Sequence, residues 1–257
     1  MQNVFDSNVH PLFPQDLEAS SDYLDELEVS LRKIGTFRAL AVSLPGLNRH
    51  VSQEQFFEIF STKHFFEPVW ALSSLTEKDV AAEVARAIDF GSRLMKIHPR
   101  LLDTNLEDER IRMALLAIAE SGMGSLLCTY PYGKSNGKNL HLPSILEATI
   151  PAESRVVLMH GGATQLLDVA EWARTKSDNL LIDLSWTIVS LHNSSVKFDI
   201  ESLVRRFEER IVVGSDYPYI ALGQFAKVLA GLEGPGLELS VKKAFGDNLN
   251  RFLLGLN

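Results

Sequence analysis

Near its N-terminus the chain reads Val4-Phe5-Asp6-Ser7-Asn8-Val9-His10-Pro11, a short apolar stretch that ends in Asp-x-Asn-x-His. Because side chains alternate along a strand, we expect Asp6, Asn8 and His10 to share one face, and the residues between them to share the other. Three polar groups on one face are poor core material, since each needs a buried partner. The pattern therefore indicates a functional site at the end of this strand.

The same arrangement returns three times along the chain. A hydrophobic stretch ends in a Lys, His or Asp, and a Gly or Pro that favours a turn lies next to it. The three segments are Lys96-Ile97-His98-Pro99, Met159-His160-Gly161-Gly162 and Val213-Gly214-Ser215-Asp216-Tyr217-Pro218. We expect all four segments to contribute to one cavity.

Strand-like runs alternate with amphipathic helical stretches along the whole chain. After the first strand, the predicted strands cover residues 37–44, 66–73, 93–98, 124–129, 155–160, 180–185 and 211–214. The predicted helices cover residues 16–33, 53–60, 77–90, 107–121, 164–175, 200–209, 222–232 and 240–254, with Thr76 as the N-cap of the third. Alternating units predict a parallel sheet, and eight of them most often close into a barrel.

We therefore predict a single α/β domain over residues 1–257, a (β/α)8 TIM barrel. A chain of this length, 46% hydrophobic, is long enough for one large core. The rival fold is an open doubly wound sheet, but no Gly-x-Gly-x-x-Gly turn follows any predicted strand. In a barrel the site lies at the C-terminal ends of the strands, where every polar segment quoted above falls.

Charge and composition narrow the class of partner. The formal net charge of −8 argues against nucleic acid, since phosphate binding needs a basic field. The single cysteine forms no internal disulfide and fits a reducing compartment. Met1-Gln2-Asn3 leads directly into the first strand, and no run of about 18 apolar residues is present. We expect a cytoplasmic protein with a small-molecule substrate and no nucleic-acid or membrane partner; a homodimer stays open.

Together the quoted segments resemble, in order and over most of the chain, the amidohydrolase-related family (amidohydrolase family 2) of TIM-barrel hydrolases and decarboxylases. That family carries Asp-x-His-x-His on strand one, Lys-x-His-Pro on strand four, His-x-Gly-Gly on strand six and Gly-Ser-Asp-x-Pro on strand eight. It closes with a Gly-x-Asn-x-x-Arg-Leu helix, which is similar to Gly246-Asp247-Asn248-Leu249-Asn250-Arg251-Phe252 here. Two positions depart from the pattern: Asn8 replaces the first metal-binding His, and Cys128 replaces a strand-five His.

The resemblance implies a divalent metal, most naturally zinc, in a partly degenerate site. Zinc prefers at least three good ligands with a place left for water. Asn8 offers only a weak amide oxygen, whereas His10, Asp216 and Cys128 as a thiolate could make three, with His160 as a fourth. The family also contains metal-free lactonases, in which the strand-eight Asp activates water directly. Both possibilities stay open at this stage.

The resemblance also implies the catalytic groups. It makes Asp216 a metal ligand or the general base, and His160 a ligand or the acid/base that faces the activated water. The structural alternatives are that Asp216 caps the next helix and that His160 is a satisfied core histidine. Asp183 and Ser185 share a face of strand seven and could orient His160 or the substrate.

Basic and aromatic residues around these positions favour a carboxylate-bearing substrate. Lys96 and His98 share a face of strand four and Arg100 follows Pro99; the alternative is an ion pair on the barrel floor. Arg49 follows strand two and Tyr130 follows strand five. The stretch after Tyr130, with Lys134 and Lys138, suits a lid, although ordinary solvated lysines are the alternative there.

We expect hydrolysis of an ester, lactone or amide bond of a small molecule by an activated water. One alternative is non-oxidative decarboxylation of an aromatic or dienoic acid on the same site. The other is a barrel whose site has decayed into a binding or scaffolding module, for which Asn8 and Cys128 are the arguments. The geometric expectation is that His10 and Asp216 come within about 5 Å of each other.

Overall fold

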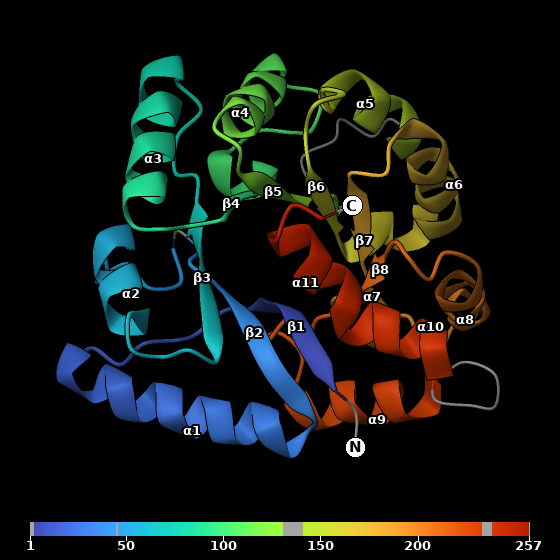
Figure 1. The fold of residues 1–257 in the computed structure, drawn as a ribbon, viewed down its shortest axis with the longest axis horizontal. Coiled ribbons are helices and arrows are strands. Elements are labelled where there is room, and N and C mark those ends of the chain that lie inside the picture. The colour runs from blue at the N-terminus through green and yellow to red at the C-terminus, as the bar shows by residue number, and fades with distance from the viewer. Residues whose placement is uncertain (1–2, 45, 131–140, 233–237, 257) are drawn as a thin grey trace.

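Eight parallel strands follow one another in sequence order around the molecule (Figure 1), in a computed structural model that describes residues 3–44, 46–130, 141–232 and 238–256. The strands are β1 (Val4–Val9), β2 (Thr36–Val42), β3 (Phe66–Ala71), β4 (Leu94–Ile97), β5 (Gly124–Cys128), β6 (Val156–Met159), β7 (Leu180–Asp183) and β8 (Ile211–Val212). Hydrogen bonds between β1 and the segment after β8 complete the ring: Ser7 N donates to Val213 O at 3.0 Å and Asp216 N donates to Asn8 O at 2.9 Å. The predicted (β/α)8 TIM barrel is confirmed.

Helices connect consecutive strands and cover the outside of the barrel, and a last group of helices follows β8 (Figure 1). They are α1 (Ser20–Lys33), α2 (Gln53–Phe60), α3 (Glu77–Asp89), α4 (Glu109–Glu120), α5 (Leu142–Thr149), α6 (Leu166–Lys176), α7 (Thr187–Ser190), α8 (Val196–Arg206), α9 (Leu222–Leu232), α10 (Glu238–Lys242) and α11 (Asn248–Leu253). Short 3-10 turns are η1 (Leu17–Ala19), η2 (Pro99–Leu102) and η3 (His160–Gln165), and a π turn, η4 (Lys243–Asp247), joins α10 to α11. None of these described helices has the length and apolar character required to cross a membrane.

The helices form where the sequence predicts them, with two additions. Thr76 caps α3 as expected, its hydroxyl accepting from Asp79 N at 3.2 Å. The two helices that the sequence pattern does not predict are α5, which directly follows a polar stretch, and α7, which is a single turn. Neither helix changes the strand order, and α7 lies next to the mouth, where the Thr187 hydroxyl donates to the carbonyl oxygen of His160 at 2.7 Å.

The core has two layers. The outer layer packs helices against the strands, and the inner layer fills the barrel with side chains such as Phe5, Leu40 and Leu126. Helix α11 belongs to the inner layer and closes the N-terminal end of the barrel, where Phe252 packs so tightly that Gly124 has no room for a Cβ. The opposite end, where the strands finish, is therefore the end left for a site.

Strand β1 departs from regular alternation. Phe5 packs in the inner layer but Val9 packs in the outer one, and the pairing with β2 shifts register between Asp6 and Val9. The expectation that Phe5, Ser7 and Val9 share one face was wrong, because Val9 turns to the outer layer after the register shift. Ser7 faces the site, where its hydroxyl donates to Asp183. Register shifts of this kind occur at barrel rims and next to active sites, where they re-aim side chains.

Candidate active site at the barrel mouth

Three residues after β6, β7 and β8 adopt a left-handed backbone that non-glycine residues seldom take. They are His160 (φ 66°), Trp186 (φ 60°) and Asp216 (φ 57°). Such conformations cost about 1–3 kcal/mol each and gather at functional sites, because the surrounding structure must hold them. All three follow strand ends, so the chain turns sharply at the place where a barrel builds its site.

Asp216, Asn8 and His10 meet at the seam between β1 and β8. Asn8 Nδ2 donates to Asp216 Oδ1 at 2.6 Å, and His10 Nε2 lies 3.4 Å from the same oxygen. Gly214 allows this approach, since a Cβ on it would meet Ser7 Oγ at 2.5 Å. The expected proximity of His10 and Asp216 is confirmed. Asp216 turns its carboxylate toward β1 rather than capping the next helix, α9, which starts at Leu222.

His10 lies between two acceptors. Its Nδ1 is 3.3 Å from the carbonyl oxygen of Val42, and its Nε2 faces Asp216. A neutral imidazole carries one N–H and can donate to only one of them. Burial lowers the pKa of His10, although the hydrogen bond to Asp216 acts in the opposite direction. Burial acts to raise the pKa of Asp216, but the hydrogen bond from His10 and the positive charges of His160 and Lys96 outweigh it.

His160 is oriented by strand β7. Its Nδ1 lies 3.0 Å from the carbonyl oxygen of Ser185, which can only accept, so Nδ1 carries a proton and Nε2 is left for another partner. Asp183 holds the same turn, because its Oδ2 accepts from His160 N at 3.1 Å and from the Ser185 hydroxyl. Asn8 Nδ2 also donates to Ser185 Oγ at 3.2 Å, which joins this network to the seam. The structure thus places Asp183 and Ser185 beside His160.

Cys128 ends β5 between two histidines. Burial raises the pKa of its thiol, but the positive charge of His98 and hydrogen bonds from His160 and His98 outweigh burial and hold the pKa well below its usual value. Burial likewise lowers the pKa of His160, but its hydrogen bond to Cys128 and the negative charge of the sulfur raise it to about 9. The pair is therefore best described as a thiolate beside an imidazolium.

Lys96 is a buried cation with 1% of its surface exposed. In the described part of the chain it forms no hydrogen bond or ion pair, and its charge interacts at longer range with Cys128, Asp216 and Asp183. Burial lowers the pKa of Lys96, and these negative groups offset only part of that effect. The alternative of an ion pair on the barrel floor is therefore not what the described residues show.

Aromatic side chains form one wall of the mouth. The ring of Tyr130 packs edge-on against His160, with centroids 5.9 Å apart, and against Trp186 at 4.6 Å. The guanidinium of Arg100 lies 5.1 Å from the centre of the Tyr130 ring. Arg49 is exposed and forms no hydrogen bond or ion pair with any described residue, so its predicted substrate contact has no structural support. The proposed lid with Lys134 and Lys138 lies outside the described residues.

Asp6 supports the site from behind. Its Oδ1 accepts from Ser215 N at 2.8 Å and from Asn8 N at 3.1 Å, while its Oδ2 is buried without a partner among the described residues. Burial raises the pKa of Asp6 to about 7, against the hydrogen bonds from Ser215 and Asn8 that lower it. The sequence analysis placed Asp6 with the site residues and missed that it binds backbone across the seam.

The residues present do not fit the divalent metal that the sequence resemblance implies. The described residues contain no group of three or more His, Cys, Asp or Glu side chains arranged to hold a metal ion. The geometry gives the reason at the seam: the amide nitrogen of Asn8, not an acceptor, points at the Asp216 oxygen that would bind metal. The predicted ligand set of His10, Asp216, His160, Cys128 and Asn8 therefore divides into two hydrogen-bonded groups.

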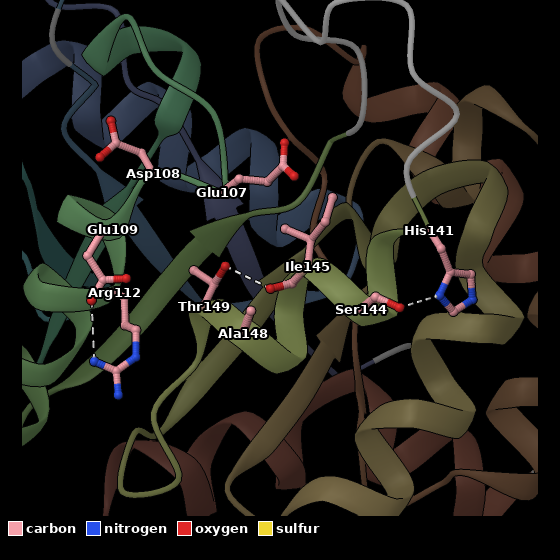
Figure 2. Close-up of a pocket in the computed structure, with 9 residues that line it drawn as sticks. All are labelled: Glu107, Asp108, Glu109, Arg112, His141, Ser144, Ile145, Ala148 and Thr149. Atoms are coloured by element: carbon pink, nitrogen blue, oxygen red, sulfur yellow. Dashed lines mark hydrogen bonds and ion pairs between the residues drawn. The ribbon is translucent and has the colours of Figure 1, made fainter.

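A hollow lies on the outside of the barrel between the start of α4 and α5 (Figure 2). Its lining consists of Glu107, Asp108, Glu109, Arg112, His141, Ser144, Ile145, Ala148 and Thr149. Arg112 pairs with Glu109, Arg110 with Asp108, and His141 Nδ1 lies 3.0 Å from Ser144 Oγ. No predicted site residue lines this hollow, so the candidate active site is the barrel mouth.

Comparison with known proteins supports the fold. No protein-family model matches this sequence, and no curated protein matches it. Among solved structures, an uncharacterized TIM-barrel protein from Bordetella bronchiseptica superposes with a TM-score of 0.80 at 17% identity, covering 98% of each chain. At 10–17% identity, the likenesses to this and the following proteins establish the fold alone.

Two further matches carry named activities. Dihydroxybenzoic acid decarboxylase from Polaromonas sp. JS666, solved with bound manganese, gives a TM-score of 0.69 at 10% identity over 99% of this chain and 97% of that one. Dihydroorotase from Campylobacter jejuni gives a TM-score of 0.63 at 14% identity, covering 100% of this chain and 84% of that one. Proteins with this fold thus include both a decarboxylase and a hydrolase-type enzyme, as the sequence analysis expected of the family it resembles.

Proposed function

We propose that this protein hydrolyses an ester, lactone or amide bond in a small molecule that bears a carboxylate. The observation that supports this most is the buried Asp216 carboxylate, held by Asn8 at 2.6 Å and faced by His10 at the barrel mouth. Asp216 has few competing roles, because its side chain caps no helix and forms no ion pair with Lys or Arg among the described residues. A carboxylate held in this way can bind and deprotonate a water.

The proposed chemistry uses two groups with opposite tasks. Despite burial, the hydrogen bond from His10 and nearby positive charges keep the pKa of Asp216 low, so it is ionised near neutral pH and can accept a proton from water. Despite burial, the hydrogen bond to Cys128 and its charge raise the pKa of His160 to about 9, so it is protonated and can donate to the carbonyl or leaving-group oxygen. Two titratable groups with separated pKa values are a usual basis for acid–base catalysis.

Lys96 supports a carboxylate on the substrate. Burying a cation that has no hydrogen-bond partner among the described residues lowers the stability of the protein. A ligand anion that pairs with Lys96 would offset this cost. The Tyr130 ring and the Arg100 guanidinium beside it offer a flat, positively flanked wall for the rest of the molecule. These features favour a small planar or compact acid.

Decarboxylation is the second candidate, and the same observations give it specific support. Lys96 could hold the carboxylate that is lost, and His160 could deliver a proton to the carbon left behind. The Polaromonas decarboxylase shows that the fold accommodates such chemistry. The two candidates differ in product, since only decarboxylation releases carbon dioxide.

The test is a substrate panel on purified protein. It contains 4-nitrophenyl acetate, mono-(4-nitrophenyl) adipate, the lactone dihydrocoumarin, a 4-nitroanilide, and a set of dihydroxybenzoates assayed for carbon dioxide. We expect turnover of the carboxylate-bearing ester that Asp216→Asn abolishes. Asp22→Asn, on the exposed face of α1, is the matched control and should leave the rate unchanged. Carbon dioxide release alone would replace hydrolysis by decarboxylation, and no turnover of any compound would support a decayed binding barrel.

A further inference from the structure

The single cysteine of the chain lies where three neighbouring strands end. In the register of β4 with β5, Ile97 pairs with Leu127, so His98 and Cys128 come next to each other. In the register of β5 with β6, Cys128 pairs with Met159, and His160 follows directly. The register therefore places the thiol of Cys128 between His98 and His160 at the mouth, where both histidines act to lower its pKa against burial, which raises it.

One of these imidazoles is held in the orientation that a base requires. Ser185 fixes Nδ1 of His160 as the protonated nitrogen through its carbonyl oxygen at 3.0 Å, which leaves Nε2 for Cys128. A nucleophile beside a base that a third group orients is the recurring arrangement of covalent catalysis. His98 is less constrained, because its Nδ1 is buried without a partner among the described residues.

A second observation points to a ligand next to the sulfur. Lys96 stands two residues before His98 on β4, is almost fully buried, and has no hydrogen-bond or ion-pair partner among the described residues. Cys128 is the group whose charge acts on it most. A substrate anion that pairs with Lys96 would bring its reacting bond to the part of the mouth that Cys128 occupies.

We propose that Cys128 is the nucleophile of the reaction and forms an acyl-thioester with the substrate. This inference rests on the proposed hydrolysis and adds a catalytic residue to it. His160 is the acid that protonates the leaving oxygen, and Asp216, beside His10, is the base that deprotonates the water ending the cycle. Lys96 binds the substrate carboxylate and takes no part in the bond changes.

The steps balance without any further reactant. The sulfur of Cys128 bonds to the carbonyl carbon, the bond from that carbon to the alkoxide oxygen breaks, and the proton of the imidazolium of His160 passes to the leaving oxygen. A water then gives a proton to Asp216 as its oxygen attacks the thioester carbon, and the carbon–sulfur bond breaks to release the acid and the thiolate. The proton on Asp216 returns to His160. The net reaction is an ester plus water giving an acid plus an alcohol.

The test uses 4-nitrophenyl acetate in stopped flow and in acid-quenched mass spectrometry. We expect a burst of 4-nitrophenolate of up to one equivalent per chain, and one acetyl group on the peptide that contains Cys128. Because the chain has only one cysteine, an acetylated thiol is unambiguous. Cys128→Ala should lose the burst and reduce steady turnover at least about 100-fold. Ser125→Ala, a buried change on the same strand, is the control, and melting temperatures verify that each variant folds.

The outcomes test the role of Cys128 as nucleophile separately from the proposed hydrolysis. Turnover that Cys128→Ala retains within a few-fold overturns the nucleophile and leaves the proposed hydrolysis intact. Turnover that Cys128→Ala loses, together with a burst or an acetylated Cys128 in the unmodified protein, supports the nucleophile. The same loss with neither burst nor acetylation overturns it and leaves Cys128 as the group that keeps His160 protonated. Acetylated Cys128 without turnover supports the nucleophile and overturns the hydrolysis. Neither acetylation nor turnover, in folded protein, overturns both.

Discussion

Asn8 and Asp216 lie 208 positions apart in the chain, yet the amide nitrogen of Asn8 donates to Asp216 Oδ1 at 2.6 Å. The bond makes Asn8 a positioning residue for the carboxylate. An amide N–H opposite a carboxylate occupies the direction from which a cation would approach. The site is thus organised by hydrogen bonds rather than by coordination.

Asn8→His should restore metal affinity. An imidazole at this position would lie beside His10 and Asp216 and complete three good ligands, whereas the amide is a weak one. Titration calorimetry with zinc and with manganese should therefore show binding in the variant that the unmodified protein lacks. Unchanged heats for both proteins would show that these three positions do not converge on a metal-sized space.

Asp216→Asn should separate catalysis from stability. The amide oxygen can still accept from Asn8, so the free energy of unfolding should change by at most about 1 kcal/mol. The variant loses the carboxylate that deprotonates water, and general-base loss typically lowers rates by about 10²–10⁴-fold. Turnover of the carboxylate-bearing ester and urea unfolding measure the two effects. A variant that keeps full activity at several pH values would reduce Asp216 to a structural residue.

Lys96→Met should stabilise the folded protein and weaken its binding of a carboxylate-bearing substrate. Removing a buried cation that lacks a hydrogen-bond partner among the described residues should raise the free energy of unfolding by roughly 0.5–2 kcal/mol. The same change should raise KM for mono-(4-nitrophenyl) adipate about 10- to 100-fold, the scale of a lost charge-assisted hydrogen bond. 4-Nitrophenyl acetate, which has no carboxylate, serves as the control substrate. An equal loss for both esters would contradict a carboxylate subsite.

Asp6→Asn should flatten the dependence of stability on pH. Burial raises the pKa of Asp6 from 3.8 to about 7, so the folded protein binds a proton that the unfolded chain releases. Stability from this group is complete below about pH 4 and is lost as the pH rises toward 7. The amide of the variant cannot ionise, so the variant should gain about 4 kcal/mol relative to the unmodified protein across that window. Denaturant unfolding at several pH values measures this, and a constant difference between the two proteins would refute it.

Much of the fold could be predicted from sequence, because alternating hydrophobic periods and Gly or Pro turns mark each β–α unit locally. The exceptions have physical reasons. Helix α5 spans only Leu142–Thr149 and follows a polar stretch, although Pro143 in its first turn is a signal that could have found it. Helix α7 is one turn that starts after a strained Trp186. The register shift in β1 depends on pairing with strands on both sides, which no local pattern records.

The sequence predicts which residues lie at the site, but not how they are hydrogen-bonded. The convergence of His10, Asn8 and Asp216 followed from strand ends that meet when a barrel closes. The bonding could not be predicted, because burial and partners are tertiary properties. Cys128 was assigned as a metal ligand on the resemblance alone, whereas its partners in the structure are His98 and His160.

The seam of the barrel and the candidate site are built from the same atoms. Ser7 N bonds to Val213 O, Asp216 N to Asn8 O, and His10 N to Tyr217 O, directly beneath the groups that face the cavity. Binding of a molecule at the barrel mouth should therefore change the rate of amide hydrogen exchange at the seam. A molecule that bridges His10 and Asp216 slows exchange at these three amides first, so the backbone itself becomes a reporter of binding that needs no knowledge of the substrate.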